Sequence, residues 1–61
     1  MNKTHIEVGD KVNVYFERVP AEFGVEVTYV PQATGDSWYV KRESGIIVAI
    51  NSFTKMEQVN E

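Results

Sequence analysis

Aromatic and cationic side chains come close together in the segment VPQATGDSWYVKRESG, at positions 30–45. Tyr39, Lys41 and Arg42 belong to it, and such a ring can stack on a base while the cations pair with a phosphate. The same residue types are also enriched in dimer interfaces. The loop before them brings hydroxyl, carboxylate and backbone N–H groups that can hold a polar ligand, from Thr34, Gly35, Asp36 and Ser37. The alternative is an ordinary hairpin loop.

Two further aromatic residues are candidates for contact with something outside the fold. Tyr15 lies in the run KVNVYFE, which alternates polar and apolar residues and places Tyr15 on the polar face. Phe23 stands between Glu22 and Gly24, in a segment that we expect to be a loop. There it either folds back over the core or projects into a partner.

The chain offers no evident catalytic constellation. His5 is its one histidine and cysteine is absent, so it has no Cys/His set for zinc. The serines fall at expected turns, where hydroxyls serve backbone hydrogen bonds. Carboxylates recur on polar strand faces and in loops, where solvation explains them. We therefore expect a protein that is not an enzyme and that uses no metal or cofactor.

Length and charge restrict the partners. A chain of 61 residues is one domain, spanning 1–61, and buries only about 60% of its unfolded surface. Without disulfides, such a small core favours oligomerisation, and we expect a homo-oligomer. The net charge of −3 disfavours nucleic acid, because phosphate binding needs clustered cations. An acidic face can instead meet a host protein. No apolar run is long enough to span a bilayer, which favours a cytoplasmic protein.

Period-2 alternation dominates and predicts an all-β chain. Long strands are expected at 11–17, 25–30, 37–42 and 46–50, with a short strand at 56–59 and a short strand or arm at 5–8. Because the run IIVAI is apolar throughout, we expect that strand to be central. The segment between it and the last strand is expected to form a single 3₁₀ turn. This order predicts a small five-stranded SH3-like barrel, with an OB-type barrel as the alternative.

Trp38 can either close the core or face a ligand. It shares a strand face with Val40, and an indole can bury more apolar area than any other side chain of this chain. We therefore expect Trp38 to be buried in the core. The neighbouring Tyr39 and Lys41 then point to solvent.

The stretches GDKVNVYF, TGDSWYVK and GIIVAINSFTKME resemble the short SH3-like open reading frames of bacteriophages and prophages. In those frames a loop ending in Gly-Asp-Ser-Trp precedes a hairpin and an Ile-Asn-x-Phe turn. The similarity covers Gly9 to Glu57. Most such frames have no assigned function, so the resemblance implies a phage setting and a host cytoplasm but no mechanism.

These observations lead to a prediction of function. We expect a non-catalytic binding module and, in the phage setting, a counter-defence protein that sequesters a small nucleotide-type signal. The alternatives are an inhibitor or adaptor that docks on a host protein and, less favoured by the charge, a nucleic-acid-binding barrel. The expected ligand-binding residues are Tyr15, Phe23, Thr34, Asp36, Ser37, Tyr39, Lys41 and Arg42.

Overall fold

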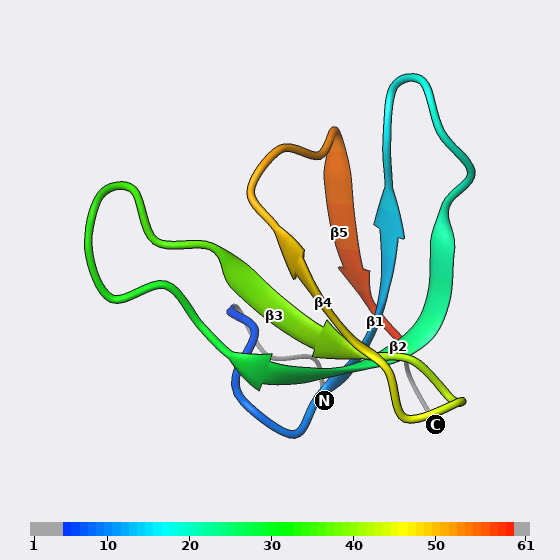
Figure 1. Cartoon of the computed structure of the whole chain (residues 1–61), viewed down its shortest axis with the longest axis horizontal. Coiled ribbons are helices and arrows are strands. Elements are labelled where there is room, and N and C mark those ends of the chain that lie inside the picture. Colours follow the sequence, from blue (N-terminus) through cyan, green and yellow to red (C-terminus); the bar gives the residue numbers. More distant parts are fainter. Residues whose placement is uncertain (1–4, 60–61) are drawn as a thin grey trace.

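Five antiparallel strands make up the fold in the computed structural model, which describes residues 5–59 (Figure 1). Those residues contain no helix, and therefore none that could cross a membrane. The prediction of an all-β chain is confirmed. The strands are β1 (Lys11–Tyr15), β2 (Glu22–Tyr29), β3 (Trp38–Lys41), β4 (Ile47–Ile50) and β5 (Lys55–Gln58).

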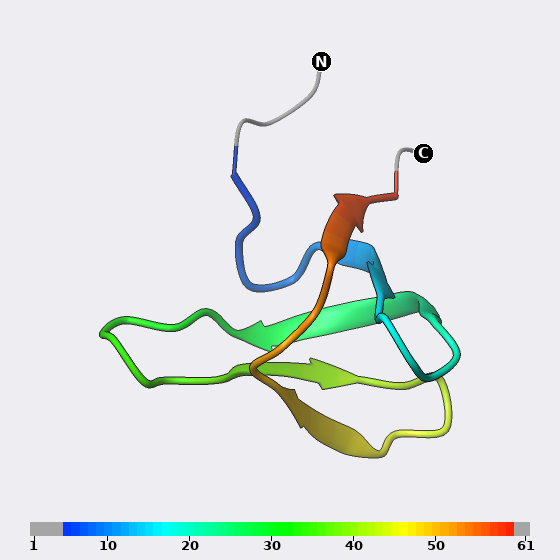
Figure 2. The ribbon, with the colours of Figure 1, turned by 90° about the horizontal axis from the view of Figure 1, so that it is seen from above.

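The five strands form one sheet in the order β4-β3-β2-β1-β5. Strands β1 to β4 follow one another as hairpins, and the chain then crosses so that β5 pairs with the free side of β1. The sheet is strongly curled, as the view from above shows (Figure 2). Within residues 5–59 its edge strands β4 and β5 do not pair, so the sheet is not closed.

Six aliphatic side chains form the buried core. Alternate residues of β1, β2 and β3 point to the same side, as the period-2 pattern predicts. Trp38 is only half-buried: it packs against this core, with its ring 6.3 Å from that of Phe53 in an edge-to-face arrangement. Trp38 therefore covers the core at the start of β3 and does not fill it. The buried residues are Val12, Val14, Val25, Val27, Val40 and Ile50.

The prediction that the fourth strand is central is wrong. β4 is an edge strand, and Ile46 and Ile47 are each 56% exposed. A hairpin places β4 beside β3, and after the chain crosses to β1 no strand of residues 5–59 pairs with the other side of β4. An apolar run was taken as the mark of a strand buried on both faces, but Ile50 is the only buried residue of β4.

Two smaller expectations are also corrected. Residues 51–54 do not form a 3₁₀ turn; they cross without one, and the backbone N–H and the hydroxyl of Thr54 both donate to the carbonyl of Tyr15, at 2.8 and 3.0 Å. Residues 5–8 contain no strand. Instead the chain turns at Val8 and Gly9, and the N–H of Gly9 donates to the carbonyl of Val27.

β2 begins earlier than the sequence pattern predicts, at Glu22. Gly24 has a φ of +65°, which side chains rarely allow, and the pairing of β1 with β2 shifts register at this point. The N–H of Gly24 donates to the Asn13 side chain at 2.9 Å. Phe23 consequently lies on a bent strand, held at a fixed place beside β1, and not in a loop.

Candidate functional site

The predicted binding residues separate into two groups at opposite ends of β3. One group lies at the β2–β3 loop and comprises Thr34, Asp36, Ser37 and Tyr39. The other lies where β2 begins and β3 ends, and comprises Tyr15, Phe23, Lys41 and Arg42. The loop and the cations after β3, which the sequence analysis treated as one site, are therefore not a single site.

Phe23, Lys41 and Arg42 of the second group line a recess of about 410 Å³ on the exposed face of the sheet, which we call the Phe23 recess. Phe23 is 67% exposed. The ring of Tyr15 supports it edge-on, with centroids 5.9 Å apart, and the Tyr15 hydroxyl donates to Glu57 at 3.2 Å. The recess thus has one exposed ring held by a second, anchored ring. It is lined by Lys11, Phe23, Gly24, Glu26, Lys41, Arg42 and Glu43.

Two lysines flank one carboxylate in this recess. Lys11 and Lys41 are the cross-strand partners of Glu26, one on each side. Both lysines are exposed, and neither forms an ion pair with another residue in the range 5–59. This row of three residues carries a net positive charge in a chain whose total is −3. An anionic group can be bound here by two ammonium groups that need not give up another partner.

Arg42 is already engaged. Its Nε and Nη2 donate to the two carboxylate oxygens of Glu22 at 3.1 and 2.6 Å, a forked ion pair. The hydrogen bonds to Glu22 raise the pKa of Arg42. Arg42 was expected to pair with a phosphate, but in the fold its guanidinium is bound to the carboxylate of Glu22.

At the other end of β3, Asp36 organises the β2–β3 loop. Its Oδ2 accepts hydrogen bonds from the backbone N–H of Gln32 and from the hydroxyl of Tyr29, both at 3.1 Å. These two bonds lower the pKa of Asp36, and the bond to Asp36 raises the pKa of Tyr29. The Tyr29 ring also contacts that of Tyr39, with centroids 5.7 Å apart. Asp36 therefore fixes the loop through its own neighbours.

Tyr29 was missed by the sequence analysis. Strict alternation places it on the core side with Val25 and Val27, but the pairing of β2 with β3 shifts register between Val27 and Tyr29 and leaves Tyr29 38% exposed. Thr34 is exposed and Ser37 half-buried, and no hydrogen bond of either side chain ties it into the loop. This end offers polar groups but no cation.

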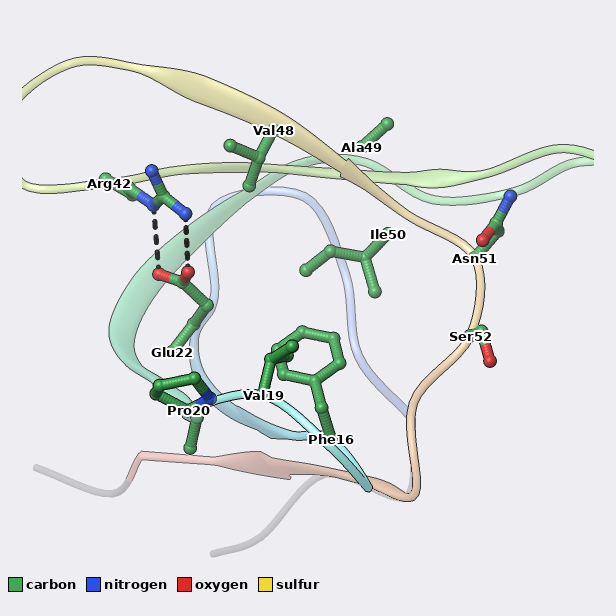
Figure 3. Close-up of a pocket in the computed structure, with 11 residues that line it drawn as sticks. Phe16, Val19, Pro20, Glu22, Arg42, Val48, Ala49, Ile50, Asn51 and Ser52 are labelled. Carbon is green, nitrogen blue, oxygen red and sulfur yellow. Dashed lines mark hydrogen bonds and ion pairs between the residues drawn. The ribbon is translucent and has the colours of Figure 1, made fainter.

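A groove beside β4 was also missed. It has a volume of about 470 Å³ and lies between β4 and the loop that joins β1 to β2 (Figure 3). Phe16, Val19 and Ile50 point into it, and the Glu22–Arg42 pair closes one end. The apolar run from Ile46 to Ile50 was the available signal, but it was interpreted as a central strand.

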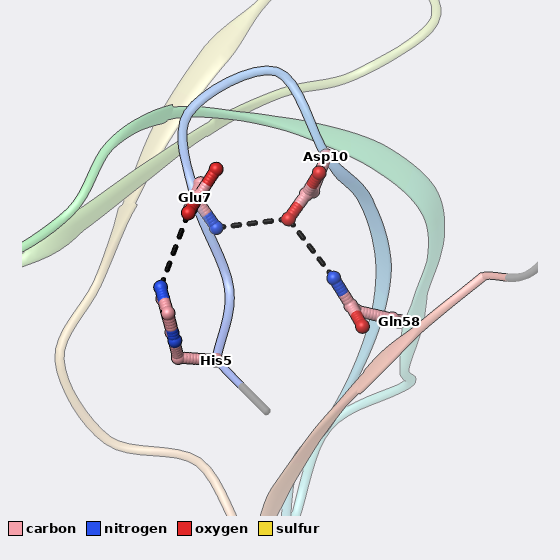
Figure 4. A network of polar contacts seen from close by, with 4 residues as sticks. All are labelled: His5, Glu7, Asp10 and Gln58. Carbon is pink, nitrogen blue, oxygen red and sulfur yellow. Dashed lines mark hydrogen bonds and ion pairs between the residues drawn. The ribbon is translucent and has the colours of Figure 1, made fainter. Parts of the chain in front are cut away.

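Polar contacts tie the segment before β1 to β5 (Figure 4). Asp10 Oδ2 accepts hydrogen bonds from the N–H of Glu7 at 2.9 Å and from the Gln58 side chain at 3.0 Å. His5 Nε2 lies 3.1 Å from Glu7. In the part of the chain that the structure describes, no group of three or more His, Cys, Asp or Glu side chains is placed to hold a metal. The hydrogen bonds of this network join the segment before β1 to β5.

No protein-family model, no curated protein and no solved structure matches this chain.

Proposed function

We propose that the protein is a non-catalytic binding module that holds a small anionic ligand with a flat ring, of the nucleotide type, in the Phe23 recess. This proposal is carried by the ammonium groups of Lys11 and Lys41, which form no ion pair within residues 5–59 and line the same recess as one exposed aromatic ring. Cations bind phosphate, and an exposed ring stacks on a base.

The size and support of the recess agree with this role. Its volume of about 410 Å³ lies within the range of small-ligand sites, about 300–1,000 Å³. Tyr15 holds the Phe23 ring from one side and leaves most of that ring exposed. Glu26, between the lysines, can accept a hydrogen bond from a ligand hydroxyl or ring N–H. Stacking, anion pairing and one acceptor together can orient a nucleotide-type ligand without any chemistry being performed on it.

We propose further that the sheet is an SH3-like barrel of open form. Its support is the strand order β4-β3-β2-β1-β5, together with a long β2 that bends at Gly24 and pairs with both β1 and β3. In the phage setting that the sequence resemblance implies, this module acts in the host cytoplasm by sequestering a signal. Sequestration needs binding alone, which suits this site.

Isothermal titration calorimetry with one mononucleotide, one dinucleotide and one cyclic nucleotide tests the proposal. Phe23→Ala should weaken binding by roughly 1–3 kcal/mol if the base stacks on this ring. Lys41→Ala should weaken binding of phosphate-bearing ligands most at low salt. Both side chains are exposed, so the fold should survive both changes.

Lys55→Ala is the matched control, because Lys55 is a cation of the same sheet that lies over Tyr15 and outside the recess. It should leave binding unchanged. The absence of heat with all three nucleotides would remove the support for a nucleotide-type ligand, and an equal loss in Lys41→Ala and Lys55→Ala would show nonspecific charge attraction.

A further inference from the structure

The outer edge of β4 pairs with no strand of residues 5–59. The backbone N–H of Arg42 donates to the carbonyl of Ile46 at 2.8 Å, and the paired residues that follow are Lys41–Ile47, Val40–Val48, Tyr39–Ala49 and Trp38–Ile50. In antiparallel strands, hydrogen-bonded and non-hydrogen-bonded pairs alternate. Val48 and Ile50 therefore bond to β3, while the N–H and C=O groups of Ile47 and Ala49 point to the free edge.

Nothing along this edge repels another strand. Residues 46–52 carry no charge and no proline, and the pairing of β3 with β4 has no bulge. Charged side chains, proline and bulges are the usual means by which edge strands avoid pairing. The backbone and the side chains of β4 thus both allow a further strand to be added.

The groove beside this edge has room for one extended segment and an apolar wall to receive it. Opposite β4 stands the β1–β2 loop, with Phe16 half-buried and Val19 58% exposed, and Ile50 points into the space between (Figure 3). Side chains of an added strand alternate between the two sides of the sheet. Every second side chain of such a segment would lie against Phe16, Val19 and Ile50.

A second copy of the chain fits this place less well than a single segment. The groove of about 470 Å³ lies between β4 and the β1–β2 loop, whereas the β4 strand of a second copy is joined to its own β3 and brings that sheet with it. Two copies also bring together charges of −3 each. The uncharged edge complements an uncharged partner segment.

We infer that β4 and its groove bind an extended, uncharged segment of another protein by antiparallel strand addition, with aliphatic side chains at alternate positions directed into the groove. Main-chain hydrogen bonds to Ile47 and Ala49 supply affinity, and the wall formed by Phe16, Val19 and Ile50 selects aliphatic side chains. This site shares Arg42 with the lining of the Phe23 recess, but the residues that bind the added strand lie outside that recess, so the inference does not depend on what the recess binds.

Proline at position 49 tests the strand addition. The N–H of Ala49 points to the free edge, so Ala49→Pro removes a donor that the fold does not use, and proline is tolerated at such edge positions. Ala49→Val is the matched control, since it adds similar bulk and keeps the N–H. The probe is an acetylated and amidated seven-residue peptide in which Thr and Val alternate, titrated into ¹⁵N-labelled protein.

We expect the amides of Ile47 and Ala49 to shift during the titration and to become slower in hydrogen exchange. Ala49→Pro should weaken binding at least tenfold, and Ala49→Val should bind as the wild type does. A peptide with Lys in place of Val should bind at least tenfold more weakly, because its charges would face the groove.

The groove wall is tested with a second pair of exposed valines. Val19→Glu should weaken the peptide at least fivefold, while Val8→Glu, at a position that is 61% exposed and outside the groove, should have no effect. Equal binding of the peptide to Ala49→Pro and wild type would overturn the inference. So would movement of the same two amides on dilution of the protein alone, which would show that a second copy covers β4.

Discussion

The two edges of the sheet differ in how they are protected. β5 carries Lys55 and Glu57 on its exposed side, and the two form an ion pair of 3.7 Å across the surface of the strand. β4 carries only aliphatic residues, although it is equally free of a neighbour within residues 5–59. Charges on an edge strand hinder pairing with other chains. Of the two edge strands in residues 5–59, only β5 therefore carries side chains that hinder such pairing.

The edges also differ in how they are attached. β4 is held to the core by Ile50, which is 4% exposed, while its next inward residue, Val48, is only half-buried. β5 contributes no fully buried residue; Met56 is half-buried and packs against the core. β4 is thus anchored by one buried side chain, whereas β5 is anchored by half-buried side chains and by its pairing with β1.

The largest effect on stability is expected when Ile50, the buried side chain of β4, is shortened. Ile50→Ala should lower the free energy of unfolding by about 2–4 kcal/mol, and Met56→Ala by only about 1–2 kcal/mol, because less area is lost from a half-buried site. Urea denaturation followed by Trp38 fluorescence measures both. A domain of this size has about 3–5 kcal/mol to lose, so Ile50→Ala lies near the limit of folding.

Ile50→Val keeps the comparison measurable if the alanine variant does not fold. It should cost about 0.5–1.5 kcal/mol. Equal losses for Ile50→Ala and Met56→Ala would show that the two edges are anchored alike, and the comparison would fail.

A smaller effect is expected when charge is moved between the edges. Ile47→Lys places a cation on the exposed side of β4, where substitutions normally change stability by less than about 0.5 kcal/mol. It should suppress aggregation on heating. The double change Lys55→Ile and Glu57→Val removes the charges of β5 and should promote aggregation.

Light scattering during a thermal ramp checks this prediction. The variants are compared at equal protein concentration and at the same interval from their own unfolding temperatures. Lys41→Ile serves as the control, since it removes a cation from the face of the sheet and not from an edge. If all variants aggregate as the wild type does, edge charge has no part in keeping the chains apart.

The sequence predicted the strands but not where each lies in the sheet. Alternation found Val12, Val14, Val25, Val27 and Val40, because the side-chain period of a strand is a local property. Edge or centre is a property of the whole topology, so the apolar run of β4 was misplaced. The groove beside β4 was missed for the same reason, because this run was assigned to the centre of the sheet.

The candidate site shows the same limit. Residues of the Phe23 recess come from β1, β2 and β3, and the bend at Gly24 that brings Phe23 to it changes the register of two strands. Tyr15, Phe23 and Lys41 were recognised as residue types that can bind a ligand. Lys11 was not, because only cross-strand pairing places it opposite Glu26. The pairing of Arg42 with Glu22 was likewise invisible, since 20 positions separate them.

The smallest effect is expected at the β2–β3 loop, and it is a dependence on pH. Asp36 has a lowered pKa because Gln32 N–H and the Tyr29 hydroxyl donate to it, and its ordinary value is 3.8. A group whose pKa is lowered by folding stabilises the fold above its unfolded pKa, and this contribution is lost as the pH falls through the folded pKa. Tyr29 has a raised pKa, so its contribution is present below its ordinary value of 10.0 and is lost as the pH rises through the folded pKa.

The β2–β3 loop should therefore be held in place between about pH 4 and pH 10 and should loosen on either side of this range. An NMR titration of the Gln32 amide should report a midpoint below pH 3.8 in the wild type and no such midpoint in Asp36→Asn. The control is Glu43→Gln, in the hairpin beyond the far end of β3, and it should leave the midpoint unchanged. A midpoint at or above pH 3.8 for the Gln32 amide would contradict this prediction. It would mean that the hydrogen bonds from Gln32 and Tyr29 to Asp36 do not hold the β2–β3 loop in solution.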